Sequence, residues 1–576
     1  MQTQSAMTLL PRSERKWWRD AVTYQVYIRS FADANGDGKG DVEGIRSRLP
    51  YLKKLGIDAI WITPWYPSPQ NDHGYDVSNY MDIEPDYGTL ADAERLIKEA
   101  HEMGMRIIVD IVPNHTSDQH AWFQAALKAA PGSKERARYM FKDGKGENGE
   151  LPPNNWNAVF GGSAWQRITE VDGKLGQWYL HLFAVEQPDL NWENEEVKSH
   201  LKDVLRFWLD RGVDGFRIDV AHGMVKAKGL PDVPKEDPNN PDMLAAIVMP
   251  FWDQDGVHEI YREWRKIFDS YEGDRMAVAE AWVSPSSRIA RYLRHDELAN
   301  SFNFEFLTSQ WDAKNLKKNI DSSLSAIQEV GAPASWVFNN HDVVRSVDRF
   351  DLGLGSGSQD TTLQRQGDPA KLDIGRGTRR ARAGALLMLA LPGGAYIYQG
   401  EELALPEVRD IPESRLTDPR WRMSNYKDRG RDGCRVPLPW NTNSAAAFGF
   451  SSNKDLKPEQ AWLPQSSWWG SYSVEMQDTN KASTLNMYRA ALAIRKAENG
   501  LGDGPMSWID AGEKVIAFTR PGNFACFVNF GREVSLPESA EVLLSSGPLN
   551  QKKLPTDTAV WLRLPLCQIR RYKLEQ

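Results

Sequence analysis

Residues 106–112 read RIIVDIV, a mostly apolar run without alternation of polar and apolar positions. Strands that are buried on both faces have this pattern, and they occur in parallel sheets that helices cover on both sides. The run follows residues 90–103, LADAERLIKEAHEM, whose apolar spacing predicts a helix. A buried strand directly after a helix indicates an α/β fold.

The same alternation of strand and helix continues in both directions along the chain. Eight short β-rich runs are separated by segments, several of which have helical apolar spacing. This order predicts a parallel (β/α)8 TIM barrel. The predicted strands cover residues 22–31, 58–63, 106–112, 215–220, 276–282, 301–306, 335–339 and 395–399, and the predicted helices cover residues 42–55, 90–103, 197–210, 257–270 and 380–391.

Two long segments interrupt the alternation. About 100 residues separate the third strand from the fourth, which is too long for a structureless loop, so we expect an inserted subdomain there. A polar tract follows the eighth strand over residues 401–483, and a predicted helix at 485–496 then closes the barrel. Runs at 514–519, 523–529, 541–544 and 560–564 predict a C-terminal antiparallel β-domain.

These segments suggest a division of the chain into four parts. The first and third parts form the barrel, the second is the inserted subdomain, and the last is a C-terminal β-sandwich. The expected boundaries are 17–114, 115–190, 191–498 and 499–576.

The composition is that of an ordinary globular protein. The 576 residues are 41% hydrophobic and 26% charged, which excludes wholesale disorder. The net charge of −8 argues against nucleic acid as a partner. No apolar run reaches the roughly 18 residues that a membrane helix needs, so no membrane partner is expected. The 22 Trp residues suit core packing, and also stacking against sugar rings.

The cysteine count bears on the compartment. Cys434, Cys526 and Cys567 are too few, and odd in number, for a disulfide framework, which fits a reducing environment. The N-terminal residues lack the charged start and apolar run of a secretory signal. We therefore expect a cytoplasmic protein, and the sequence leaves its oligomeric state open.

Acidic residues end several predicted strands. Asp219 ends the fourth strand, Glu280 lies near the end of the fifth, and Asp342 follows the seventh, while the third strand carries Asp110 and leads to His115. In a (β/α)8 barrel the C-terminal strand ends surround the active site. We therefore expect these acids to converge on one cleft.

The surroundings of two acids suggest different protonation states. Arg217 lies two residues before Asp219, on the same strand face, which favours Asp219 as a permanent carboxylate. Glu280 lies between two alanines with Trp282 just beyond, which favours a raised pKa and a proton donor. A carboxylate opposite a protonated acid is the arrangement for glycosidic bond cleavage. The alternative is that each acid caps a helix or pairs with an arginine.

Several motifs at barrel-consistent spacing resemble a known family. DIVPNH at 110–115, GFRIDV at 215–220, AEAW at 279–282 and FNNHD at 338–342 resemble the signature regions of the α-amylase superfamily, glycoside hydrolase family 13. QPDLNW at 187–192 resembles the additional region of its α-glucosidase and oligo-1,6-glucosidase branch, as do YQGEEL at 398–403 and RDGCRVPLPW at 431–440. The resemblance extends from about residue 17 to the C-terminus in the expected order.

The resemblance implies a retaining double displacement. In that reaction Asp219 would be the nucleophile, Glu280 the general acid/base and Asp342 the stabiliser of the transition state. The other implied residues bind the terminal glucose: Arg217, His115 and His341 hold the sugar, Asp72 and Arg431 read its non-reducing end, Tyr75 stacks against it, and Phe160 and Phe183 form apolar walls.

The segment DANGDGKGD at 33–41 carries oxygen ligands on a glycine-rich turn. Such ligands suit a hard cation, although Gly44 stands where an EF-hand loop needs its bidentate glutamate. The alternative is a polar turn rich in Asp and Gly. The resemblance favours a structural Ca²⁺ and implies no organic cofactor. The implied ligands are Asp33, Asn35, Asp37, the carbonyl of Lys39, and Asp41.

A site that reads terminal glucose implies exo action on short α-glucosides. In this branch, Val at the position of Val220 often accompanies α-1,6 specificity, but the residues that follow it differ from those of α-1,6-specific members. We expect a retaining α-glucosidase that favours α-1,4 linkages and also transfers glucose. Alternatives are an oligo-1,6-glucosidase, or an isomerising relative such as sucrose isomerase or trehalose synthase. An alternative of another class is a non-catalytic amylase-like scaffold. Such a protein would lack the three catalytic acids and would carry a membrane anchor.

Overall fold

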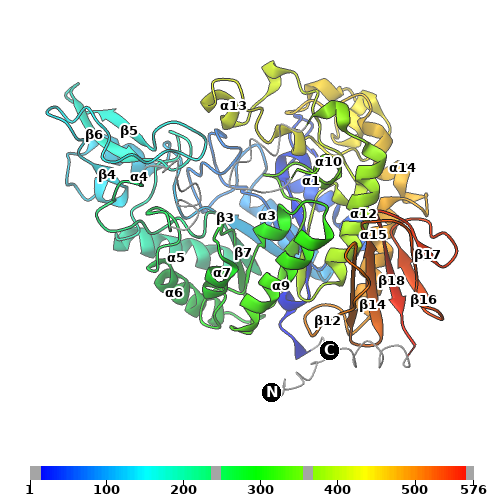
Figure 1. The fold of residues 1–576 in the computed structure, drawn as a ribbon. Helices are drawn as coiled ribbons and strands as arrows, with labels where there is room; N and C mark the ends of the chain where they lie inside the picture. The colour runs from blue at the N-terminus through cyan, green and yellow to red at the C-terminus, as the bar shows by residue number, and fades with distance from the viewer. Residues whose placement is uncertain (1–13, 235–247, 355–367, 566–576) are drawn as a thin grey trace, which may run out of the picture.

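The computed structural model describes residues 14–234, 248–354 and 368–565, and it contains a barrel of eight parallel strands (Figure 1). The strand order is β10-β11-β1-β2-β3-β7-β8-β9, so the predicted (β/α)8 barrel is confirmed. No hydrogen-bonded pairing joins β9 to β10 among the described residues. The strands are β1 (Val22–Val26), β2 (Ala59–Ile62), β3 (Arg106–Ile111), β7 (Gly215–Ile218), β8 (Met276–Ala279), β9 (Asn300–Ser301), β10 (Ser335–Val337) and β11 (Gly394–Tyr398).

Helices pack around this ring (Figure 1). The helix predicted at 42–55 is in fact two helices, because Pro50 cannot donate the backbone hydrogen bond of a helix interior and instead occupies the first turn of the second helix. The principal helices are α1 (Val42–Ser47), α2 (Leu49–Leu55), α3 (Leu90–Glu102), α5 (Glu195–Asp210), α6 (Val257–Asp269), α7 (Ser286–Tyr292), α9 (Ala313–Gln328), α10 (Ser346–Leu352), α12 (Ile374–Ala390) and α15 (Thr484–Ala497).

The predicted sixth strand is largely wrong. Only Asn300–Ser301 is extended, and the short helix α8 (Phe304–Leu307) occupies the rest of the segment. The side chain of Asn303 accepts a hydrogen bond from the backbone N–H of Phe306 and caps this helix. A cap of this kind outweighs the β propensity of the surrounding aromatic residues. The first predicted strand also ends early, at Val26, before a 3-10 turn at Ile28–Ser30.

The insertion between β3 and β7 has a fold of its own. It contains α4 (Ala121–Lys128) and a three-stranded antiparallel sheet of β4 (Phe141–Lys142), β6 (Leu175–Leu180) and β5 (Trp165–Thr169). In Figure 1 this sheet projects from the barrel on the side away from the C-terminal domain. The predicted inserted subdomain is therefore present.

An antiparallel five-stranded sheet follows α15. Its order is β12-β13-β14-β18-β16, and a separate pair joins β15 to β17. The four predicted strands are found, whereas β12, β15 and β17 have two residues each and are too short for a recognisable pattern. The strands are β12 (Ser507–Trp508), β13 (Val515–Arg520), β14 (Phe524–Asn529), β15 (Val534–Ser535), β16 (Glu541–Ser545), β17 (Lys553–Leu554) and β18 (Thr558–Arg563).

Within the three described ranges, no helix combines the length and apolar character needed to cross a bilayer.

Candidate active site

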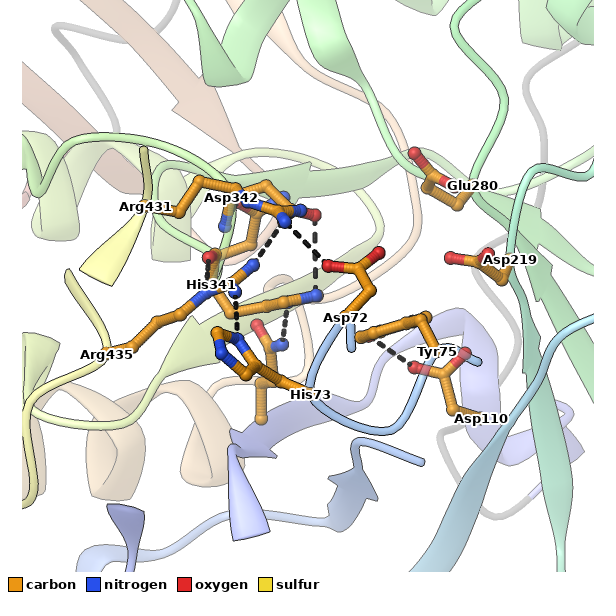
Figure 2. Close-up of polar contacts among 12 residues, drawn as sticks. Asp72, His73, Tyr75, Asp110, Asp219, Glu280, His341, Asp342, Arg431 and Arg435 are labelled. Carbon is orange, nitrogen blue, oxygen red and sulfur yellow. Dashed lines mark hydrogen bonds and ion pairs between the residues drawn. The ribbon is translucent and has the colours of Figure 1, made fainter. Parts of the chain in front are cut away.

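The barrel places two of the predicted acids side by side. Ile218 and Ala279 are register partners at the ends of the neighbouring strands β7 and β8. Asp219 and Glu280 are the next residues, so they leave the sheet at the same level. Both side chains line one cavity of about 120 Å³, and Asp342 lies on its opposite side (Figure 2). The predicted convergence of the three acids is thus found.

Arg217 lies beneath the acids, where one guanidinium contacts three carboxylates. Its Nη1 donates to Asp219 Oδ1 at 2.5 Å and to Asp110 Oδ1 at 2.9 Å, and its Nη2 lies 3.4 Å from Glu280 Oε2. The side chain is 1% exposed and does not line the cavity. In this structure Arg217 therefore orients the acids, whereas the sequence interpretation gave it a direct contact with the sugar.

Two donors fix the carboxyl group of Glu280. The backbone N–H of Val220 donates to Oε2 at 2.7 Å, and the indole Nε1 of Trp282 donates to Oε1 at 2.8 Å. Val220 has φ of 45°, a strained conformation for a β-branched residue. This conformation directs its amide toward Glu280, a role that the sequence did not indicate.

The Asp219–Glu280 pair retains a proton near neutral pH. Burial raises the pKa of Asp219 to about 8, with Glu280 adding to the rise and Arg217 opposing it. Burial also raises the pKa of Glu280. Arg217 lowers the pKa of Asp219, as the sequence predicted, but burial raises it by more. Because Arg217 lies closer to Asp219 than to Glu280, the shared proton is more stable on Glu280.

Asp342 has the opposite electrostatics. Burial alone would raise its pKa, but His341 and the guanidinium groups of Arg431 and Arg435 together hold it well below its usual range. The two arginines donate to Asp342 Oδ1 at 3.0 and 2.9 Å. Asp342 is therefore ionised at every pH at which the protein is expected to work.

A network of charges closes one end of the cavity. Arg431 donates to Asp72 Oδ1 at 2.7 Å and to Asp342 Oδ1 at 3.0 Å (Figure 2). It also donates to Asp418 Oδ2 at 2.7 Å. Gln187 donates to the other oxygen of Asp72 at 3.3 Å. The pairing of Asp72 with Arg431 agrees with the sequence interpretation, whereas Asp418 lies in the long polar tract and matches no motif.

The cavity walls are aromatic and neutral. The ring of Tyr75 stacks on that of His341 with centroids 5.3 Å apart and planes within 5°, and its hydroxyl donates to Asp110 at 3.0 Å. Burial lowers the pKa of His115 to about 4 and also lowers that of His341, so both rings are neutral at pH 7. Phe160 and Phe183 complete the predicted walls.

Sequence reasoning missed part of the lining. Of the eleven catalytic and substrate residues predicted, all but Arg217 line the cavity. Val220 and Trp282 lie in recognised motifs, but no contact with the cavity was assigned to them, and the others lie in loops whose positions depend on tertiary contacts. The additional lining residues are Val159, Val220, His222, Trp252, Trp282 and Arg420.

The predicted calcium loop has a structural role in the fold. Asp41 accepts backbone hydrogen bonds from Ala34 and Asn35 at 2.9 Å and from Gly44 at 2.6 Å, and so caps α1. Asp33 accepts from Gly36 and Gly38. In the described part of the chain, no group of three or more His, Cys, Asp or Glu side chains is arranged to hold a metal ion. The calcium site stays a prediction.

A barrel whose strand ends carry paired acids under a sugar-sized cavity is the architecture of a glycoside hydrolase. Residues 25–504 match the family described as alpha amylase, catalytic domain, and the chain belongs to this family. It is 37% identical to a probable alpha-glucosidase of Rhizobium meliloti, over 91% of each chain. It is 34% identical to an oligo-1,6-glucosidase of Parageobacillus thermoglucosidasius, over 84% of each. The solved alpha-glucosyl transfer enzyme XgtA superposes with a TM-score of 0.81 at 33% identity, covering 95% of this chain and 99% of the other.

Proposed function

We propose that this protein is a retaining, exo-acting α-glucosidase that releases the terminal non-reducing glucose of short α-glucosides. The observation that carries the proposal is the acid pair Asp219 and Glu280 on neighbouring strands, above one shared guanidinium and lining one cavity. A nucleophile and an acid/base on adjacent strand ends are what double displacement requires.

The first step forms a glucosyl-enzyme. Asp219 Oδ attacks the anomeric carbon while the glycosidic C–O bond breaks, and Glu280 donates its proton to the departing oxygen. Arg217 orients both carboxyl groups, and the ionised Asp342 stabilises the positive charge that develops on the sugar.

The second step releases glucose. Glu280, now ionised, takes a proton from water, and the water oxygen attacks the anomeric carbon from the face that the leaving group vacated. The bond to Asp219 breaks and α-glucose leaves. An alcohol in place of water gives glucosyl transfer, which is the named activity of the superposed XgtA structure.

Exo action follows from the closed end of the cavity. Its volume of about 120 Å³ is smaller than the roughly 300 Å³ at which small-molecule sites usually begin, so it holds a single sugar ring. The ion network of Asp72, Arg431 and Asp342 blocks extension of a chain beyond that ring. A terminal residue is therefore the only part of an oligosaccharide that fits.

A panel of substrates tests the function and the linkage together. Maltose, isomaltose, sucrose, trehalose and p-nitrophenyl α-glucoside are incubated with the protein, and the anomer of the first product is followed by NMR. We expect α-glucose to appear first, with maltose cleaved faster than isomaltose. The reverse preference would make the protein an oligo-1,6-glucosidase, and a β-glucose first product would exclude retention.

Arg431→Lys tests the closed end. Lysine keeps the charge but cannot bond three carboxylates in one plane. Because lysine would leave the carboxylates at this end of the cavity incompletely paired and displaced, we expect kcat/KM for maltose to fall on the order of 10²-fold, equivalent to about 2.7 kcal/mol of transition-state stabilisation. The matched control is Arg422→Lys, whose side chain is 55% exposed. Equal activity of both variants would refute a role of Arg431 in binding the terminal glucose.

The structural Ca²⁺ is also part of the proposal. The loop supplies oxygen ligands. Burial raises the pKa of Asp37 and Asp41, and the nearby Asp33 adds to the rise, whereas backbone hydrogen bonds oppose it. Crowded carboxyl groups of this kind are stabilised by a bound cation. Asp33, Asn35, Asp37, Asp41 and the carbonyl of Lys39 are the proposed ligands.

Calcium should raise the melting temperature. A ligand present at 100 times its Kd stabilises the folded state by about 2.7 kcal/mol, and scanning calorimetry in Ca²⁺ and in EDTA measures the shift. Asp37→Ala should abolish the shift, whereas Glu43→Gln on the adjacent helix α1 should retain it. The same melting temperature in both buffers would refute the calcium site, and the loop would then be a polar turn.

We also propose a cytoplasmic location. Cys434 and Cys526 are buried, and Cys567 lies outside the described residues. Three cysteines in 576 residues are a sparse and odd count, which is typical of proteins of reducing compartments. Fractionation of the source cells tests the location.

A further inference from the structure

A second cavity lies outside the barrel, between α7, α8 and α9. Its volume is about 360 Å³, about three times that of the active-site cavity. It extends from residues 281–284, directly after Glu280, to residues 333–335 at the start of β10. This is the side on which β9 and β10 are not hydrogen-bonded to each other among the described strands.

The lining of this cavity suits a neutral hydroxylated molecule. Aromatic and aliphatic side chains supply its apolar surface, Asn303 adds an amide, and Glu305 adds a carboxyl group that accepts a hydrogen bond from Ser286. None of its described lining residues is Lys, Arg or His, so nothing there would pair with a phosphate or carboxylate. The hydroxyl groups belong to Ser284, Ser286, Ser301, Thr308, Ser323 and Ser335.

One of these hydroxyls has no partner. Ser335 is 3% exposed, and its Oγ makes no hydrogen bond among the described residues. Other polar groups of the lining are paired, since Asn303 donates to Ser323 at 2.6 Å and Ser286 donates to Glu305 at 3.2 Å. Because the Oγ of Ser335 has almost no accessible surface, a molecule in the cavity would contact the other hydroxyl groups of the lining and not this one.

Trp282 connects the two cavities. It lines both of them, and its Nε1 donates to Glu280 Oε1 at 2.8 Å. Its ring stacks on Phe304, with centroids 3.8 Å apart and planes at 19°. Phe304 also lines the second cavity, so a molecule bound there contacts the ring pair that fixes one oxygen of Glu280.

We propose that this second cavity binds a neutral polyhydroxylated molecule of monosaccharide size, and that its occupancy alters the acid/base step through Trp282. The volume lies within the range of small-molecule sites. The binding part stands on the cavity alone, whereas the effect on catalysis rests on the function proposed above. Glucose, the product of that reaction, has the required chemistry.

Binding is tested with the active site blocked. The protein is saturated with 1-deoxynojirimycin, a glucose-shaped amine, and equilibrium dialysis then measures bound radiolabelled D-glucose. We expect about one glucose per chain to remain bound. Two variants fill the second cavity, Ser323→Leu on α9 and Ile289→Trp on α7, and each should abolish this binding; the second serves if the first does not fold. No bound glucose in the blocked wild type, or retention in a folded filled variant, would overturn the site.

Kinetics test the coupling. Glucose should compete at the active site and, separately, change kcat by about fivefold, as coupling energies between sites commonly do, with a shift in the pH profile of kcat. Ile289→Trp should keep the competition and lose the change in kcat. A protein that cleaves no α-glucoside would refute the proposed function, while dialysis would still decide the binding; an unchanged kcat with confirmed binding would refute the coupling.

Discussion

Asp219→Asn should lower kcat roughly 10³-fold or more while the protein stays folded. The amide has the shape of the carboxylate but cannot attack the anomeric carbon, so no covalent intermediate forms. Cleavage of the glycosidic bond then loses the two-step route with its lower barriers. The turnover of p-nitrophenyl α-glucoside measures the effect, and circular dichroism checks the fold. Turnover within tenfold of the wild type would refute Asp219 as the nucleophile.

The same variant should be more stable than the wild type at alkaline pH. Burial raises the pKa of Asp219 from its ordinary 3.8 to about 8, so the stability associated with its protonation is present below pH 3.8 and is lost as the pH rises through about 8. An amide has no such dependence. The gain in melting temperature of Asp219→Asn should therefore grow from pH 5 to pH 9. Asp203→Asn, on the exposed face of α5, is the control and should show no such growth.

The strand-end acids could be predicted because they depend on periodicity and topology alone. Parallel strands deliver their C-terminal ends to one face, so Asp219 and Glu280 had to meet once the barrel was recognised. The sixth strand could not be predicted in the same way. One capping side chain, Asn303, determines the local structure there, against the propensity of the aromatic residues around it.

The remaining lining was beyond the sequence for a physical reason. Trp252 and Val159 lie in loops that only the folded chain brings to the cavity, and Asp418 is placed by its bonds to Arg431. The raised pKa of Asp219 was not anticipated, because Arg217, its neighbour in sequence, is visible in the chain, whereas burial is a property of the whole fold. The raised pKa of Glu280 was predicted, because apolar residues adjoin it in the sequence itself.

Glu280→Gln should separate substrates by their leaving groups. Glutamine cannot donate the proton that a sugar leaving group needs, so kcat for maltose should fall about 10²–10⁴-fold, the usual contribution of a general acid. The p-nitrophenolate ion leaves without protonation, so formation of the glucosyl-enzyme from p-nitrophenyl α-glucoside should suffer far less. A burst of p-nitrophenol measured by stopped flow would show this directly. Glu263→Gln, on the exposed face of α6, should behave as the wild type.

The pH profile of the same variant gives an independent check. The wild type needs one proton on the Asp219–Glu280 pair, and since burial raises the pKa of Asp219 to about 8 and that of Glu280 as well, activity should fall as the pH rises above about 8. Glutamine does not titrate, so in Glu280→Gln the alkaline decline of the burst rate should disappear while the acidic decline remains. An alkaline decline that persists would place the essential proton on a group other than Glu280, because ionisation of Asp219, the remaining member of the pair, produces the nucleophile and does not remove activity.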